Sequence, residues 1–375
     1  MPSPSPSPDP SRLAYDRAYE RIARVCAAGG EPRQLRVRLL RELRAVLGFD
    51  AFAFLLTDPV TEVGCAPVAR VPDLAELPRI VRLKYLTPVN RWTGLSGAAA
   101  LSGYAPGARG AMWAQALAPL GVRDLASVVF RDRHGCWGFL DLWRYGTRAA
   151  ARYGDGTGGV AGPFGPAELG FLDRIAGPVT AALRAGQAAA FTVRPPGAVR
   201  PGPLVLLLSP GLRVRGRTPG SDAYLAGLLP PKAGEAPVPA AVYNVAAQLL
   251  AREAGVDPHP PRARVHLADG LWLTLRAARI GGEEEPVTGR AEDREIAVTI
   301  EESTPAERLD VFCRAYGLSA RETGLLGLLA EGADSHRLAG ALFLSEHTVQ
   351  DHLKSVFAKT GTHSRRALLA RALGT

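Results

Sequence analysis

The sequence predicts a multidomain α+β protein that ends in an all-α domain of four helices. The chain has 375 residues, which suffices for two or three domains at ~100–200 residues each. Helical and strand-like hydrophobic patterns alternate up to about residue 303, and the patterns from residue 311 onward are all helical. The stretch at residues 195–203, PPGAVRPGP, sustains neither a helix nor a central strand, so it marks a domain boundary.

The composition is that of folded domains with an excess of positive charge. Hydrophobic residues make up 47% and charged residues 22% of the chain, which argues against wholesale disorder and against a long coiled coil. The formal net charge of +9 allows a polyanionic partner without proving one, since an arginine-rich composition alone accounts for it. Only four basic residues are lysines, and two of them, Lys354 and Lys359, lie close together near the C-terminus.

The cysteines and the first residues indicate a cytoplasmic protein. The four cysteines form no CxxC pair, so we expect neither disulfides nor a cysteine-based zinc site, and no metal or cofactor is predicted. Residues 1–11 alternate Pro with Ser and are expected to form a disordered tail rather than a signal peptide. No apolar run approaches the ~18 residues of a membrane span, so no membrane partner is expected.

The first predicted domain covers residues 12–190 and is α/β or α+β. Leucines at helical spacing predict two helices within residues 12–47, the second of which ends at Gly48. The apolar run at 51–56 predicts a buried strand. Two further strand-like runs, at 125–131 and 136–143, flank the turn-forming residues 132–135 and predict a β-hairpin, and a helix at 166–185 follows.

The second predicted domain covers residues 204–303 and follows a linker at residues 191–203. Its expected elements are two strands, two helices and three strands, at 204–208, 212–217, 220–229, 239–254, 264–267, 271–280 and 295–300.

The third predicted domain, residues 311–375, begins each of its four helices with a serine. Ser319 and Glu322 form a capping box, in which each side chain bonds to the backbone of the other residue. Ser335, Ser345 and Ser364 are the expected caps of the other three helices. On the third helix, apolar residues at i, i+4, i+7 and i+8 are predicted to face inward; these are Val349, Leu353, Val356 and Phe357.

Two short helices joined by a tight turn match the helix-turn-helix, whose second helix enters the major groove of DNA. Gln350, Asp351 and Lys354 lie opposite the apolar side of the third helix. Lysine can donate to guanine, glutamine can pair with adenine, and aspartate can accept from cytosine, so these three are the candidate base-reading residues. Thr348, Lys359 and Arg365 are placed to contact phosphates, which set affinity rather than sequence preference.

The segment from Leu318, which contains SEHTVQDHLKSVFAKTG and SRRALL, closely resembles the C-terminal helix-turn-helix of LuxR/GerE-type bacterial transcription regulators. The resemblance spans the whole ~60-residue module. It implies base reading and phosphate contacts by the residues named above, and dimerisation on double-stranded DNA through the fourth helix. The apolar side of that helix consists of Leu368, Leu369 and Ala372.

The two upstream regions carry weaker resemblances. The stretches FDAFAFLLTDP and SVVFRDRHGCWGFLDLWR resemble the GAF-like sensory domains found ahead of such modules in actinobacterial regulators. The order of elements in residues 204–303 resembles that of a PAS-like domain. Both resemblances imply a small-molecule effector of unknown identity. Four tryptophans in the first domain are either ordinary core residues or a pocket lining: Trp92, Trp113, Trp137 and Trp143.

Two functions fit these patterns. The first is a sequence-specific DNA-binding transcription regulator that acts as a homodimer under the control of the sensory domains, with RNA polymerase as a candidate partner. The second is a sensor that binds protein partners and uses the C-terminal helices for dimerisation. An enzymatic role is not expected. Asp351 has two equal interpretations, a base contact or an ion pair with Lys354 one turn away.

Overall fold

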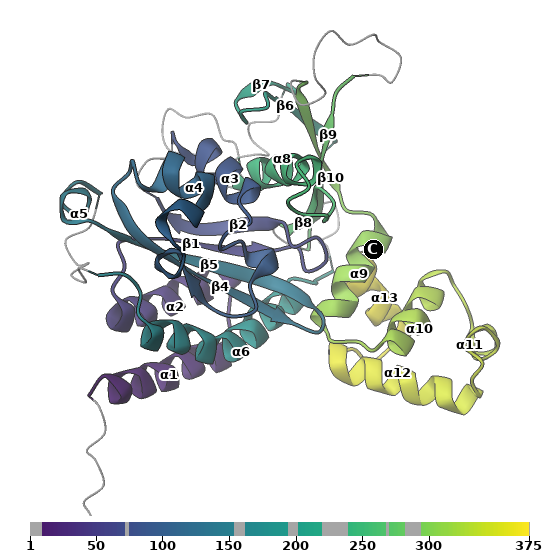
Figure 1. The fold of residues 1–375 in the computed structure, drawn as a ribbon. Coiled ribbons are helices and arrows are strands. Elements are labelled where there is room, and N and C mark those ends of the chain that lie inside the picture. The colour runs from purple at the N-terminus through teal and green to yellow at the C-terminus, as the bar shows by residue number, and fades with distance from the viewer. Residues whose placement is uncertain are drawn as a thin grey trace, which may run out of the picture.

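The computed structural model describes residues 10–71, 75–153, 162–193, 202–219, 239–267, 270–281 and 294–374. Within these ranges the chain forms two antiparallel sheets and a lobe of C-terminal helices (Figure 1). The helices are α1 Pro10–Ala28, α2 Pro32–Leu47, α3 Leu77–Leu86, α4 Gly110–Met112, α5 Thr147–Tyr153, α6 Pro166–Ala189, α8 Ala240–Glu253, α9 Pro305–Ala315, α10 Ala320–Ala330, α11 Ser335–Leu342, α12 Glu346–Thr360 and α13 Arg365–Leu373. The strands are β1 Ala51–Thr57, β2 Gly64–Arg70, β3 Ala99–Ala100, β4 Val122–Asp132, β5 Gly135–Tyr145, β6 Leu204–Leu208, β7 Val214–Arg217, β8 Arg262–His266, β9 Trp272–Arg279 and β10 Ile296–Glu302.

The first sheet has the strand order β2-β1-β5-β4-β3. Helices α2 and α6 cover one of its faces, and α1 packs against these two helices (Figure 1). The predicted hairpin is confirmed, since β4 and β5 pair antiparallel and Asp132 lies opposite Gly135 at the turn. The α/β alternative for this region is wrong: every strand pairing among the described residues is antiparallel, whereas an α/β sheet requires parallel strands.

The second sheet has the order β7-β6-β10-β9-β8. Counted along the chain, both sheets therefore arrange their strands as second, first, fifth, fourth and third. Helix α8 packs against its own sheet and also against β2 and α3 of the first unit, and Val242, Val245 and Ala246 on it are fully buried. The helix expected at 220–229 lies outside the described residues, as do residues 1–9 and most of the proposed boundary at 195–203.

Buried side chains join the two sheet units. Asp58, directly after β1, forms an ion pair with Arg264 on β8, with Nε to Oδ2 at 2.7 Å, and both side chains are at most 1% exposed. Arg91 and Asp257 form a second buried pair at 2.9 Å. Phe191, the first residue of the predicted linker, is fully buried and stacks on the ring of Trp272. The described parts of the two units are thus packed into one body.

The helical lobe begins earlier than the sequence patterns suggested. Helix α9 starts at Pro305, where Thr304 and Glu307 form a capping box, so the predicted start at residue 311 falls inside this helix. The signal is present in the sequence as Thr-Pro-x-Glu, with proline at the first helical position. Helix α9 packs against both α6 and α13 and thereby connects the lobe to the rest of the chain.

A fragment that includes all of α9 should be more stable than one that begins at residue 311. Residues 304–310 supply the capping box and Arg308, whose guanidinium donates to the carbonyls of Ala372 and Arg371 at the end of α13. We expect fragment 304–375 to exceed fragment 311–375 by about 2 kcal/mol in free energy of unfolding. Urea denaturation followed by circular dichroism measures this, and equal midpoints and slopes would contradict it.

Candidate nucleic-acid interface

Helices α11 and α12 are separated by a tight turn and lie at the far end of the lobe (Figure 1). Asp334 caps α11 by accepting from the amide of Arg337 at 2.8 Å, so the expectation that Ser335 is the cap is wrong. Phe343 ends α11 in the left-handed conformation, with φ 54° and ψ 46°. Ser345 then caps α12 by accepting from the amide of Thr348 at 3.1 Å, as the sequence predicted.

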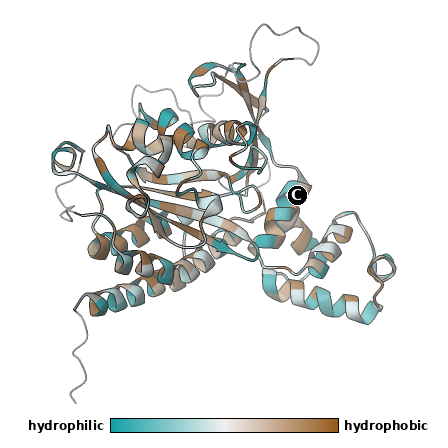
Figure 2. Cartoon of the chain, viewed as in Figure 1, coloured by the Kyte–Doolittle hydropathy of each residue, from teal (hydrophilic) through white to brown (hydrophobic). Residues whose placement is uncertain are grey.

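The buried side of α12 fixes the direction of its polar side. Val349 and Val356 are fully buried and Leu353 is 2% exposed. Gln350 is exposed, and the side chains of Asp351 and Lys354 are 55% and 73% exposed. The predicted orientation of this helix is therefore confirmed. In Figure 2 the N-terminal end of α12, next to α11, is largely hydrophilic.

Two of the candidate base-reading residues form an ion pair with each other. Lys354 Nζ lies 3.1 Å from Asp351 Oδ1, and Nε2 of His347 lies 3.6 Å from the other carboxylate oxygen. The hydrogen bond from Lys354 lowers the pKa of Asp351. The ion-pair interpretation of Asp351 is therefore what the structure contains. Both groups are exposed, and exposed pairs contribute little to stability, so either side chain can turn toward another partner.

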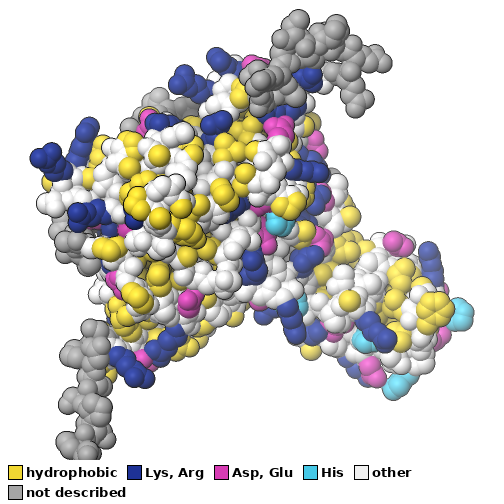
Figure 3. Space-filling view, in the orientation of Figure 1, with side chains coloured by type: hydrophobic (Ala, Val, Ile, Leu, Met, Phe, Trp, Pro, Cys, Tyr) yellow, Lys and Arg dark blue, Asp and Glu magenta, His cyan; other side chains and the backbone are white. Residues whose placement is uncertain are grey.

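Two candidate residues, Gln350 of α12 and Arg365 of α13, converge on Ser335, the first residue of α11. The hydroxyl of Ser335 accepts from Gln350 Nε2 at 3.4 Å and from Arg365 Nη2 at 2.8 Å. Thr348 is half-buried, and its hydroxyl lies 2.8 Å from that of Ser345. The lobe also presents histidine and basic side chains on the face seen in Figure 3.

Lys359 lies away from this group and has a partner inside the protein. Its ammonium bonds to both carboxylate oxygens of Glu322 on α10, at 2.6 and 2.9 Å, and Ser355 donates to the same carboxylate. Lys359 also lines a hollow of about 410 Å³ that faces α6. A phosphate contact by Lys359 would therefore compete with an ion pair that holds α10 against α12.

The Glu322 ion pair gives the chain a measurable pH dependence. Burial raises the pKa of Glu322, but bonds from Lys359, Ser319 and Ser355 outweigh it and lower the pKa to about 2, below the ~4.3 of an unfolded chain. The carboxylate therefore stabilises the fold above about pH 5, and about 2 to 3 kcal/mol is lost as the pH falls toward 2. Urea denaturation across this range should show the loss, and Lys359→Met should reduce it; an unchanged profile in the variant would contradict the assignment.

The three residues expected on a dimer face are largely enclosed by the chain itself. Leu368 and Ala372 are fully buried and Leu369 is half-buried. Helix α13 packs against α9, and Arg371 Nε donates to the carbonyl of Phe191 at 2.8 Å. Helical spacing predicted that this side of α13 is apolar, but it could not distinguish a partner within the chain from a second protomer.

The described part of the chain gives little support for a metal site, a reactive thiol or a membrane-spanning helix. No group of three or more histidine, cysteine, aspartate or glutamate side chains there is arranged to hold a metal ion. The four cysteines are free, and burial raises the pKa of each thiol, to about 11 for Cys26 and Cys313 and about 12 for Cys65 and Cys136. Among the described helices none is long and apolar enough to cross a bilayer.

The capped helices, the tight turn and the outward polar face of α12 together define a helix-turn-helix domain of the DNA-binding class. Residues 317–372 match the family model described as bacterial regulatory proteins, luxR family (GerE). This match supports a DNA-binding transcription regulator, and regulators of this family are generally non-enzymatic. A comparison of the whole chain with curated proteins finds no match.

Proposed function

We propose that the protein is a sequence-specific transcription regulator that reads the major groove of double-stranded DNA as a homodimer. Gln350, Asp351 and Lys354 are the base-reading residues, and Thr348 and Arg365 contact phosphates. Lys359 contacts phosphate only where its bond to Glu322 opens. The observation that carries this proposal is the orientation of α12, whose buried valines and leucine leave its polar side exposed at the end of the lobe.

The two sheet units are the proposed sensory part, GAF-like in residues 12–190 and PAS-like in residues 204–303. Their shared strand order and the sequence of two strands, helical residues and three strands support a common type of fold. Dimerisation through Leu368, Leu369 and Ala372 requires α13 to leave α9 and to break the bonds of Arg308 and Arg371. The sensory units would therefore control DNA binding by holding α13 against the rest of the chain or by releasing it for dimerisation.

Selection of bound duplexes from a random double-stranded library, with the full chain, tests the proposal. We expect enrichment of a motif with two half-sites, because a dimer repeats its contacts about one helical turn apart. If each protomer neutralises two or three phosphates, log K should fall with log salt with a slope of roughly −4 to −5. Failure to enrich any motif, together with a stable dimer in sedimentation, would favour the protein-binding alternative.

A further inference from the structure

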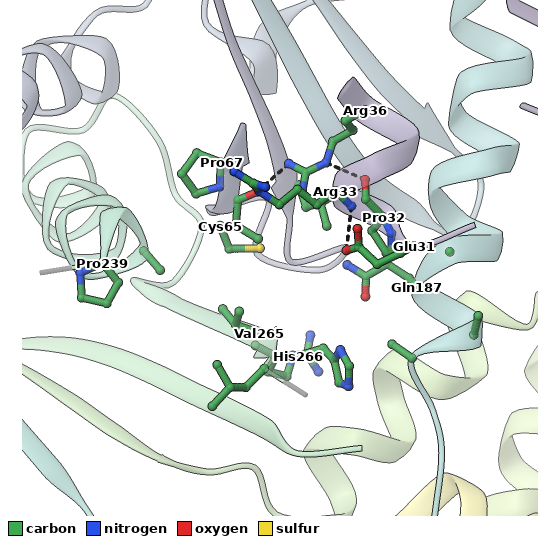
Figure 4. Close-up of a pocket in the computed structure, with 18 of the residues that line it drawn as sticks. Glu31, Pro32, Arg33, Arg36, Cys65, Pro67, Gln187, Pro239, Val265 and His266 are labelled. Carbon is green, nitrogen blue, oxygen red and sulfur yellow. Dashed lines mark hydrogen bonds between the residues drawn. The ribbon is translucent and has the colours of Figure 1, made fainter. Parts of the chain in front are cut away.

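A cavity of about 730 Å³ lies between the first and second sheet units. Its walls come from the start of α2, from β2, from the end of α6, from the start of α8 and from β8 (Figure 4). Pockets for small molecules in proteins have volumes of about 300 to 1,000 Å³ and mostly apolar walls. This cavity has that size, and Leu56, Pro67, Val265 and Leu267 contribute apolar surface to it.

One wall carries a buried positive charge without a carboxylate partner. Arg36 is 2% exposed, and its guanidinium donates to the carbonyls of Pro32, Phe54 and Ala66 at 3.1, 3.0 and 2.5 Å. No carboxylate in the described ranges lies within ion-pair distance of it. Arg264, also at the cavity, pairs with Asp58 and Asp310 and is thus neutralised. A buried charge without a counter-charge is costly, so Arg36 is a site that an anion would stabilise.

A second polar group at the cavity lacks a partner. Gln187, near the end of α6, is 6% exposed, and its Oε1 has no hydrogen-bond partner in the part of the chain that the structure describes. Buried polar atoms are almost always hydrogen-bonded, and an oxygen at this position requires a donor rather than an anion. A half-turn of the amide exchanges its oxygen and nitrogen, which allows Gln187 to donate to an anionic ligand.

The start of α8 also favours a negatively charged group in the cavity. Ala240 and Ala241, in its first turn, line the cavity, and the amides of a first helical turn favour a negative charge. Glu31, the acidic residue among those that line the cavity, already accepts from the amides of Arg33 and Gln34, both at 2.8 Å, as the cap of α2. The polar part of the cavity is therefore suited to a ligand's anionic group.

We propose that this cavity binds a small carboxylic acid with an apolar body. The carboxylate bonds to Arg36 and Gln187, and the apolar body lies against Val265 and Leu267. The site does not depend on DNA binding, and it is close to the lobe: Ala190 lines the cavity, and the carbonyl of the next residue, Phe191, accepts from Arg371 of α13.

Isothermal titration calorimetry of the full chain with octanoate, octan-1-ol and octylammonium tests this proposal. The three probes share one apolar body and differ in the charge of the head. We expect octanoate to bind at least about 10-fold more tightly than the alcohol, and the cation not to bind. Absence of octanoate binding at millimolar concentration, or equal binding of the alcohol, would overturn the proposal.

Substitutions of the cavity residues test whether octanoate binds in this cavity. Arg36→Met should remove the preference for octanoate over octan-1-ol. Gln187→Leu replaces an unpaired buried amide with an apolar group of similar size, so this variant should fold even if Arg36→Met does not. It should weaken octanoate binding at least about 3-fold. Arg41→Gln, at an exposed arginine of α2 outside the cavity, is the matched control and should bind like the parent. Unchanged octanoate binding by a folded Gln187→Leu protein would place the ligand elsewhere and overturn the assignment.

Discussion

Replacing Lys354 with alanine should lower the affinity for the selected duplex at least about 30-fold and leave the fold intact. The side chain is 73% exposed and its ion-pair partner, Asp351, is exposed as well, so its loss leaves no buried group unpaired. A good base contact contributes about 1 to 3 kcal/mol, and a dimer makes the contact twice, which gives about 2 to 6 kcal/mol. Fluorescence anisotropy with the selected and a scrambled duplex measures the loss.

The control variant must remove one positive charge at a position outside the helical lobe. Arg41→Ala does so, because Arg41 is an exposed residue of α2, and it should change the affinity for the selected duplex by less than about 2-fold. Lys359→Ala is unsuitable, since it would also remove the partner of the buried Glu322 carboxylate. Equal losses in Lys354→Ala and Arg41→Ala would mean that only net charge attracts DNA.

Alanine at Asp351 separates the two interpretations of that residue. If the carboxylate only pairs with Lys354, its removal frees the ammonium and takes a negative charge from the DNA-facing side, so affinity should rise for the selected and the scrambled duplex alike. If it accepts from cytosine, affinity should fall for the selected duplex alone. We expect the second result, and the same anisotropy measurement distinguishes them.

The sequence predicted local features well because their causes are local. The caps at Ser319, Ser345 and Ser364 and the inward face of α12 depend on residues three to eight positions apart, and the structure contains all of them. The ion pair of Lys359 depends on Glu322, 37 positions away, and on the packing of α10 against α12. The burial of α13 depends on α9 and on Phe191, 180 positions from Arg371, so helical spacing could not reveal it.

The same reasoning applies to Asp58, which the sequence shows only as an aspartate between a strand and a proline. Its partner, Arg264, is 206 positions away. The carboxylate accepts from Nε at 2.7 Å, from Nη2 at 2.8 Å and from the backbone amide of Arg264 at 2.9 Å. Arg264 also bonds to Asp310 of α9 at 2.8 Å, so this one guanidinium connects the first sheet unit, the second sheet and the helical lobe.

Asp58→Asn should therefore destabilise the protein by about 3 to 5 kcal/mol, because it leaves a buried guanidinium without its main counter-charge. Burial raises the pKa of Asp58, but the bonds from Arg264 outweigh it and the pKa is lowered, so the carboxylate is ionised at neutral pH. Urea denaturation followed by circular dichroism measures the loss. The matched control is Asp16→Asn, which removes a carboxylate from an exposed ion pair with Arg174 and should cost at most about 1 kcal/mol.

The double variant Asp58→Asn/Arg264→Met, compared with the two single variants Asp58→Asn and Arg264→Met, distinguishes a buried ion pair from simple packing. Removing both charges leaves no buried charge unpaired, and the side-chain oxygen of asparagine can still accept from the amides of Val60 and Thr61. The double variant should therefore recover most of the stability lost in Asp58→Asn, with a coupling energy of about 2 kcal/mol or more between the two positions. If the two losses simply add, or if Asp58→Asn costs no more than Asp16→Asn, the guanidinium does not hold the three parts of the chain together.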